Sequence, residues 1–222
     1  VKVKATVAHR AVVIIGSKSH KLSSNVENTD PAYGRKGLVS VAIKTYKPYV
    51  KRVRPLDDTP EARLTAELVN EFTEKVVEML DQHPVNVERR KRGELPANVL
   101  LLRDAGGELP KAEPITEKYG LKFSLIAEMP IELGIGKAFG ADVMEAPPPT
   151  SSPERDYRIR LDLALKALET HDILYIHLKG PDEPGHDGNQ VLKKERIEDI
   201  DRYFIVPLLK ELSSDCLLYT SD

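Results

Sequence analysis

The sequence predicts an α/β protein in which a parallel sheet is flanked by helices. In the second half of the chain, short apolar runs alternate with segments that have apolar residues every three or four positions. Glycine and proline stand between these segments and break them into short elements. Since strand–helix–strand alternation is typical of a parallel sheet covered on both faces, we expect that architecture here.

The predicted elements of the second half follow one another in regular order. Strands are expected at residues 122–126, 142–145 and 173–178, and helices at 131–139, 153–170 and 191–212. We expect Pro207 to kink or interrupt the last helix, because proline has no amide hydrogen and its ring crowds the preceding turn.

The first half is predicted to be strand-rich with one long helix. Strands are expected at residues 1–7, 11–15 and 99–102, a polar loop at 16–37 and a helix at 60–82. Asp58 or Thr59 can cap that helix, and Pro60 suits its first turn. A stretch rich in glycine and proline, Gly107–Pro114, marks the expected domain junction, with domains at 1–110 and 111–222.

Composition excludes several classes of protein. No apolar run approaches the roughly 20 residues that span a bilayer, so we expect no membrane association. A formal net charge of −2 gives no general attraction to nucleic acid. The single cysteine excludes an internal disulfide and fits a reducing compartment, so we expect a cytoplasmic protein. The basic run Glu88–Arg92 is interpreted as a solvated loop or helix end, with phosphate binding as the alternative.

The segment that follows the strand 173–176 carries the most chemistry. It reads HLKGPDEPGHDGN at residues 177–189 and leaves the carboxyl end of a strand, where open α/β sheets place their sites. Asp182 and His186 lie four residues apart and supply a carboxylate and an imidazole, which are ligands of divalent ions. Lys179 could hold an anionic group. The alternative to a metal site is an ordinary surface turn, and the alternative for Lys179 is a solvated lysine without a ligand.

Two further residues are singled out by their position at strand ends. Arg103 follows the predicted strand 99–102, where its planar fork could hold phosphate or carboxylate; the alternative is a turn. His177 is interpreted as a packed, hydrogen-bonded residue of its strand and not as a metal ligand.

The segment at 177–189 resembles the metal-binding segment of the archaeal-type cofactor-independent phosphoglycerate mutases, which belong to the alkaline phosphatase superfamily. Other stretches agree with that family in order along the chain, up to about Leu212. They are AHR at 8–10, LSSN at 22–25, TDPAY at 29–33, HPVN at 83–86, LPAN at 95–98, LRDAG at 102–106, KYGLK at 118–122 and IEDID at 197–201.

The resemblance implies both a fold and an activity. The fold would be a partial alkaline-phosphatase-like sheet flanked by helices at 111–222, truncated at its C-terminus, with an inserted α+β substrate-handling domain at 1–110. Enzymes of this family interconvert 2-phosphoglycerate and 3-phosphoglycerate in glycolysis and gluconeogenesis through a phosphoserine intermediate. They use two divalent metal ions, usually manganese, with magnesium, cobalt or zinc as alternatives.

The resemblance also suggests roles for individual residues. Asp182 and His186 match two ligands of one metal site, and Lys179 matches a lysine beside them. The motifs of the inserted domain add further candidates for substrate binding, which are His9, Arg10, Asn98 and Arg103.

The chain also departs from the family pattern. The nucleophilic serine and a ligand aspartate of the family lie upstream of this sequence, and none of its early serines stands in the motif: Ser17, Ser19, Ser23 and Ser24. The family's Thr-x-Asp-His pair lies downstream, and Thr220–Asp222 is either its beginning or foreign sequence. Pro147–Pro153 stands where the family has a Thr-Gly turn.

We therefore expect a fragment that binds metal weakly and has no activity of its own. Two alternatives remain for the parent protein. One is a metal-dependent phosphatase or other phosphotransferase of the same superfamily, and the other is a non-catalytic relative. The oligomeric state is not predicted.

Overall fold

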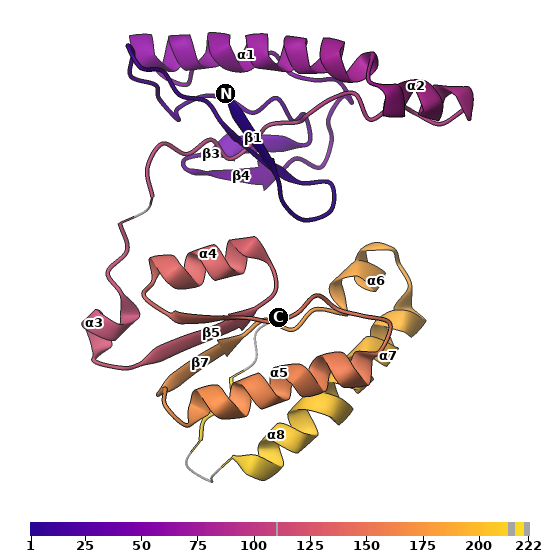
Figure 1. The fold of residues 1–222 in the computed structure, drawn as a ribbon. Coiled ribbons are helices and arrows are strands. Elements are labelled where there is room, and N and C mark those ends of the chain that lie inside the picture. The colour runs from indigo at the N-terminus through magenta and orange to yellow at the C-terminus, as the bar shows by residue number, and fades with distance from the viewer. Residues whose placement is uncertain (110, 213–215, 220–222) are drawn as a thin grey trace. The chain divides into compact units, whose positions relative to one another are not determined.

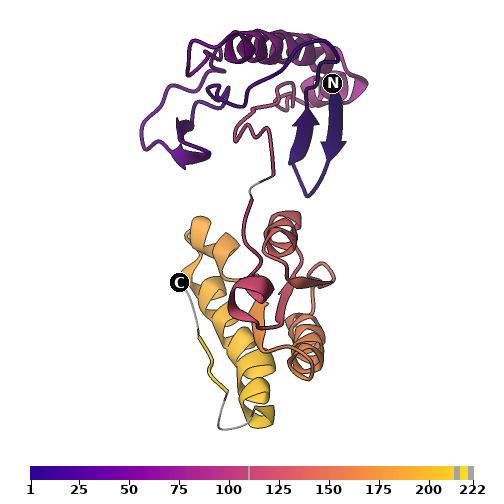
Figure 2. The ribbon, with the colours of Figure 1, turned by 90° about the vertical axis from the view of Figure 1, so that its left-hand side faces the viewer.

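The computed structural model describes residues 1–109, 111–212 and 216–219. The chain forms two compact units, which are described separately (Figures 1 and 2). Unit one comprises residues 1–5 and 11–109, and unit two comprises residues 6–10 together with the chain after Leu109. Among the described residues, no helix is long and apolar enough to cross a membrane.

Two β-hairpins form the strands of unit one. β1 (Lys2–Ala5) pairs antiparallel with β2 (Ala11–Ile14), and β3 (Tyr33–Lys36) pairs antiparallel with β4 (Val39–Ala42). The second hairpin corrects the expectation of a polar loop that extends to residue 37. Its turn contains Gly37 at φ +61°, a backbone angle that glycine adopts without steric cost.

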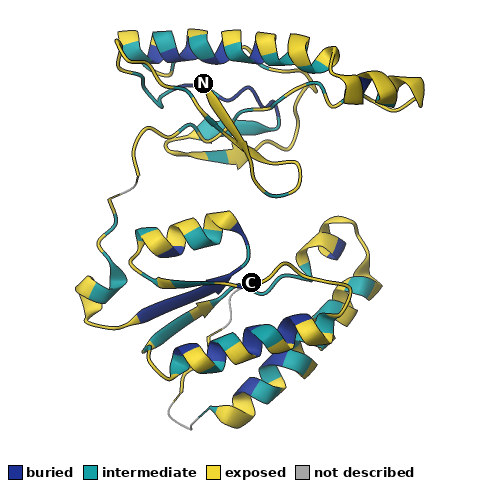
Figure 3. Cartoon of the chain, viewed as in Figure 1, coloured by how far each residue is buried: buried dark blue, intermediate teal, exposed yellow. Residues whose placement is uncertain are grey.

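The long helix of unit one, α1 (Pro60–Asp81), begins as the sequence predicts. The Thr59 hydroxyl accepts a hydrogen bond from the Ala62 amide at 3.2 Å and so caps the first turn. The buried positions of α1 lie along one side of the helix (Figure 3), and Ala66 and Val69 pack there against Val26 and Val53.

An amide side chain ties α1 to the segment before it. Asn70 is 8% exposed, accepts from the Val53 amide at 2.8 Å and donates to the Val53 carbonyl at 2.9 Å. It therefore satisfies both backbone groups of an extended residue that has no neighbouring strand.

Two expectations for unit one are corrected. A second helix, α2 (Pro84–Lys91), follows α1 directly. The predicted strand at 99–102 is instead an extended segment without a strand partner. Its end is held by one residue, since the Thr29 amide donates to the Leu102 carbonyl at 2.9 Å and the Leu102 amide donates to the Thr29 hydroxyl at 2.6 Å. A side chain takes the place of the neighbouring strand, which periodicity cannot predict.

A parallel three-stranded sheet forms the centre of unit two. β5 (Phe123–Ala127) lies between β6 (Asp142–Glu145) and β7 (Ile173–Ile176), and all five β5 residues are buried. Helix α4 (Pro130–Ala138) lies on one face of the sheet and α5 (Pro153–Leu168) on the other (Figure 1). The expected fold class, a parallel sheet flanked by helices, is confirmed.

The helices on the α5 face enclose the larger apolar core. Ile126 of β5 is fully buried against Leu161 of α5 and Phe204, a residue of the last helical segment. Tyr157 of α5 also belongs to this cluster and is 5% exposed. The packing of this core fixes α5 relative to the carboxyl ends of β5 and β7.

The predicted last helix is divided into three parts. α7 (Gln190–Ile200) leads into a π-helical turn, η1 (Asp201–Ile205), and then into α8 (Val206–Glu211) (Figure 2). Pro207 lies in the first turn of α8. The proline ring would crowd the carbonyl four residues earlier, so the wider π turn directly before α8 accommodates it, and the predicted interruption occurs there.

One short helix escaped prediction at the start of unit two. α3 (Ile115–Tyr119) ends at Gly120, whose φ is +67°. The left-handed glycine terminates the helix directly before β5.

Candidate functional site

The candidate metal segment leaves the sheet at the carboxyl end of β7. The His177 amide donates to the Ile126 carbonyl at 2.9 Å, so the pairing with β5 extends one residue beyond β7. Lys179 and Gly180 then carry the chain away from the sheet. The segment therefore begins where parallel α/β sheets place their sites.

The expected turn after Pro181 is a short helix, α6 (Asp182–His186). The helical spacing of four places Asp182 and His186 on the same face. The His186 Nε2 and the Asp182 Oδ1 are 3.3 Å apart, and the two side chains are 80% and 82% exposed. The fold thus brings the two predicted ligands to one point on the surface.

Those two side chains can supply part of a metal site. A carboxylate oxygen and an imidazole nitrogen at this separation fit two positions around one divalent ion. A complete protein site needs further ligands, and within residues 1–109, 111–212 and 216–219 no three His, Cys, Asp or Glu side chains are grouped to hold a metal. The candidate ligand pair at Thr220–Asp222 lies outside the described residues.

A buried tyrosine of α5 holds the backbone before α6. The Tyr157 hydroxyl donates to the Lys179 carbonyl at 2.7 Å. Burial raises the pKa of Tyr157, which keeps the hydroxyl protonated as a donor. Lys179 is half-buried, and its ammonium has no hydrogen bond or ion pair within the described part of the chain. The ammonium is therefore available for an anion.

Gly180 leaves room for the hydrogen bond between the Tyr157 hydroxyl and the Lys179 carbonyl. Its φ is +144°, and a Cβ atom at this position would lie 2.5 Å from the Tyr157 hydroxyl oxygen. Both the backbone angle and the close approach exclude a side chain here.

We expect Gly180→Ala to lower the free energy of unfolding by about 1–3 kcal/mol, because the backbone strain adds to the collision with Tyr157. Urea denaturation of the 222-residue chain measures this. Gly134→Ala is the matched control: Gly134 lies in α4, and its added Cβ meets nothing within 4 Å. The control should be stabilising. Equal effects of the two substitutions would contradict the prediction.

His177 does not make the hydrogen bond expected of it through Nδ1. That nitrogen is buried without a partner in the described part of the chain, and so is the Oε2 atom of Glu132 in α4. The two side chains approach to 3.8 Å between the His177 Nδ1 and the Glu132 Oε1, which is too long for a direct hydrogen bond.

A buried ion pair at the carboxyl end of β5 was missed in the sequence. Glu128, directly after β5, accepts from the Arg160 guanidinium of α5, and the two side chains are 5% and 2% exposed. Arg160 also donates to the Asp156 carbonyl at 2.9 Å and to the Pro147 carbonyl at 3.0 Å. One sequence signal could have indicated this pair. Arg160 lies at the apolar face of its helix, next to Leu161, where a charged side chain needs a buried partner.

The same arginine contributes to fixing the proline-rich connector at 147–153. Asp156, which is 6% exposed, accepts from the Thr150 amide at 2.6 Å and from the Thr150 hydroxyl at 2.9 Å. The connector is therefore held by contacts from α5 at Pro147 and at Thr150.

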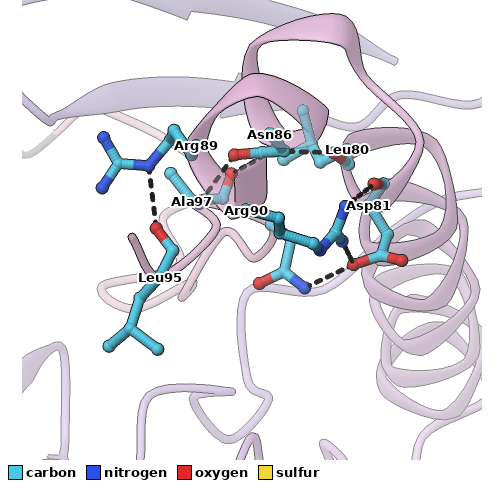
Figure 4. Close-up of polar contacts among 8 residues, drawn as sticks. Leu80, Asp81, Asn86, Arg89, Arg90, Leu95 and Ala97 are labelled. Carbon is cyan, nitrogen blue, oxygen red and sulfur yellow. Dashed lines mark hydrogen bonds and ion pairs between the residues drawn. The ribbon is translucent and has the colours of Figure 1, made fainter. Parts of the chain in front are cut away.

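Two arginines of the basic run in α2 make contacts that stabilise the fold. The Arg89 Nε donates to the Leu95 carbonyl at 2.8 Å, and Arg90 pairs with Asp81 at the end of α1 (Figure 4). Asn98, a predicted substrate ligand, donates to the same Asp81 carboxylate at 2.9 Å. The Asn98 amide nitrogen is therefore engaged in a structural contact.

The other three predicted substrate ligands in the first half of the sequence are exposed. His9 and Arg10 lie in the turn between β1 and β2, where the Thr6 amide donates to the Arg10 carbonyl at 3.0 Å. The Arg103 guanidinium stacks over the Tyr33 ring at 3.9 Å from its centroid. Of the predicted site residues, the structure brings the side chains of Asp182 and His186 together, with 3.3 Å between Oδ1 and Nε2.

Comparison with known proteins gives the family. The sequence pattern of the metalloenzyme superfamily matches residues 58–222. The chain belongs to the metalloenzyme superfamily. A second pattern, that of 2,3-bisphosphoglycerate-independent phosphoglycerate mutase, matches residues 1–86. Membership implies dependence on divalent metal ions. The two matches overlap at 58–86, so the assignment of 1–110 and 111–222 to two family domains stays a prediction.

Curated relatives agree with the resemblance found in the motifs. The chain is 48% identical over 213 residues to a 2,3-bisphosphoglycerate-independent phosphoglycerate mutase of Aeropyrum pernix, covering 95% of this chain and 50% of the relative. It is 38% identical to the enzyme of that name from Methanopyrus kandleri, covering 96% of this chain and 47% of the relative. The chain thus spans about half the length of these relatives, which is consistent with the expected fragment.

Solved structures give the same result. A cofactor-independent phosphoglycerate mutase from Thermoplasma acidophilum is 30% identical with a TM-score of 0.50, covering 87% of this chain and 44% of that structure. A protein from Pyrococcus horikoshii is 25% identical with a TM-score of 0.58, covering 87% of this chain and 57% of that structure. The resemblance to archaeal-type cofactor-independent phosphoglycerate mutases is confirmed.

Proposed function

We propose that a protein containing this chain interconverts 2-phosphoglycerate and 3-phosphoglycerate without added 2,3-bisphosphoglycerate. One observation carries the proposal: the identity to the mutase of Aeropyrum pernix, 48% over 95% of this chain. The proximity of Asp182 and His186 adds support, because a carboxylate and an imidazole 3.3 Å apart are suited to bind one divalent ion.

In this proposal Asp182 and His186 hold one of two divalent ions, with Mn²⁺ as the first candidate and Mg²⁺, Co²⁺ or Zn²⁺ as alternatives. The bound ions would lower the pKa of the attacking serine hydroxyl and neutralise charge on the phosphoryl oxygens. Lys179 would add a positive point charge beside the transferred group.

Residues in the first half of the sequence would hold the phosphoglycerate. His9, Arg10 and Arg103 offer exposed donors for its phosphate and carboxylate groups. Asn98 is the weakest of the four candidates, because its amide nitrogen already binds Asp81. We place the inserted domain at 1–110 and the metalloenzyme domain at 111–222. The nucleophilic serine is not among these residues, so the 222-residue chain alone should be inactive.

The test is an assay of the longer protein with 3-phosphoglycerate as substrate and no 2,3-bisphosphoglycerate. The formation of 2-phosphoglycerate is measured in a coupled assay, in which a second enzyme dehydrates the product. We expect turnover with Mn²⁺, loss of turnover with a chelator and recovery when the ion is restored. Release of inorganic phosphate in place of 2-phosphoglycerate would identify a phosphatase, and no turnover with any of the four ions would favour a non-catalytic relative. Turnover by the 222-residue chain would show that it contains its own nucleophile.

A further inference from the structure

Three consecutive residues of unit one are each held by the hairpin formed by β3 and β4. The Arg103 guanidinium stacks on the Tyr33 ring at 3.9 Å. The Asp104 Oδ1 accepts from the Ser40 amide at 2.9 Å, and the Ala105 carbonyl accepts from the Arg35 Nη2 at 2.8 Å. One hairpin therefore contacts the guanidinium of Arg103, the side chain of Asp104 and the backbone carbonyl of Ala105.

The positions of these contacts follow from the hairpin itself. Tyr33 and Arg35 are two residues apart on β3 and so project from the same face. Arg35 lies opposite Ser40 in the register of the two strands. The Arg35 Nε also donates to the Gly37 carbonyl at 2.9 Å, which holds its guanidinium against the hairpin turn.

The turn that these contacts hold is strained. Asp104 has a φ of +58°, which is unfavourable for a residue with a side chain. Such a conformation persists only where the surroundings impose it, and strained residues of this kind cluster at binding and catalytic sites. The Ser40 amide constrains the Asp104 side chain, and Arg35 constrains the backbone at the next residue, Ala105.

The Arg103 guanidinium is oriented, yet its hydrogen-bond donors are not used. Within the described part of the chain it makes no hydrogen bond, and its nearest carboxylate oxygens are those of Asp30 at 3.8 Å and Asp104 at 3.7 Å. The side chain is 38% exposed. Stacking engages only the face of the guanidinium, and both ion pairs are too long for hydrogen bonds. The N–H groups in the guanidinium plane can therefore still donate to a planar, two-oxygen partner.

We propose that the β3–β4 hairpin positions Arg103 as a preformed binding group for a phosphate or carboxylate, with Tyr33 and Arg35 as positioning residues. This inference rests on the proposed function for the identity of the ligand, which would be one anionic end of a phosphoglycerate. The ligand chemistry itself follows from the free guanidinium fork, because phosphate and carboxylate match its two parallel donors.

The first experiment measures the affinity of the 222-residue chain for three probes by calorimetry: inorganic phosphate, glycerate and 3-phosphoglycerate. Saturable binding that Arg103→Gln abolishes supports the proposal. Loss of phosphate binding assigns the phosphate end to Arg103, and loss of glycerate binding assigns the carboxylate end. No saturable binding of any probe, or unchanged binding in Arg103→Gln, would overturn it.

The second experiment separates positioning from stability. Tyr33→Leu removes the aromatic face and should weaken binding by about three- to tenfold, whereas Tyr33→Phe keeps the ring and should bind like the parent. The free energy of unfolding is measured for both variants. A purely structural tyrosine would change stability in Tyr33→Leu and leave the affinity unchanged.

A third variant should bind the anionic probes more tightly, a result that damage to the fold would not produce. Asp104→Asn keeps a side-chain acceptor for the Ser40 amide, tolerates the left-handed backbone and removes the negative charge near Arg103. We expect anion binding to tighten about three- to fivefold at low ionic strength and the gain to disappear at high salt. An unchanged or weaker affinity at low salt would contradict the inference. These measurements involve no catalysis, so their outcome is independent of whether the longer protein is a mutase.

Discussion

Replacing Asp182 or His186 with alanine should lower the proposed mutase activity of a protein containing this chain by at least about 100-fold. The two side chains meet at 3.3 Å and are exposed, so neither has a structural contact of its own to lose. Each substitution would remove one of the two proposed ligands of a divalent ion. Since metal ions supply several kcal/mol of charge stabilisation in phosphoryl transfer, loss of a ligand should lower kcat far more than it changes stability.

The matched control is Glu183→Ala. Glu183 lies on the same short helix and is also exposed, but it makes no side-chain contact within the described residues. The control should retain activity to within about twofold, because a solvated carboxylate contributes little. Excess Mn²⁺ should partly restore the two ligand variants if the loss reflects metal affinity. Normal activity in either ligand variant would remove that residue from the metal site.

Replacing Arg160 with methionine should destabilise unit two by about 3–5 kcal/mol. The substitution leaves the buried Glu128 carboxylate without its partner and also removes the donor to the Pro147 carbonyl. An unpaired buried charge is far more costly than the net gain of the pair. Because the chain has two compact units, hydrogen exchange of the β5 amides measures the effect in unit two alone.

Two further variants make this prediction specific. Arg158→Met removes an exposed ion pair with Glu154 on the same helix and should cost at most about 0.5 kcal/mol. In the double variant Arg160→Met with Glu128→Gln, the unpaired charge is gone, so part of the lost stability should return. Equal losses in Arg160→Met and Arg158→Met would show that the buried pair is not important.

The outcome for α1 shows what local sequence can establish. Thr59, Pro60 and the apolar stripe predict this helix, and its cap and bounds agree with the expectation to within one residue. Capping and periodicity are local properties, and they depend only on neighbours within a few positions. The strands of unit two were found for the same reason, because short apolar runs between glycines and prolines are local signals.

The segment at 99–102 shows where local reasoning fails. Its apolar run predicts a strand, but its last residue binds Thr29, which lies 73 residues away. None of the described residues forms a strand beside it, and only the folded chain reveals that the Thr29 hydroxyl satisfies the Leu102 amide. The buried pair of Glu128 and Arg160 is a second case, since its partners are 32 residues apart and belong to a strand end and a helix.

Sequence alone was sufficient to predict the fold class of unit two, the family resemblance and the proximity of Asp182 and His186. These depend on local periodicity, on motifs and on a spacing of four residues that a helix turns into proximity. The tertiary structure decided what holds those residues in place. Tyr157 holds the backbone at Lys179. Tyr33 orients Arg103, although the two residues are 70 positions apart in the sequence. Such contacts join residues distant in sequence, so they form only when packing of the core brings their elements together.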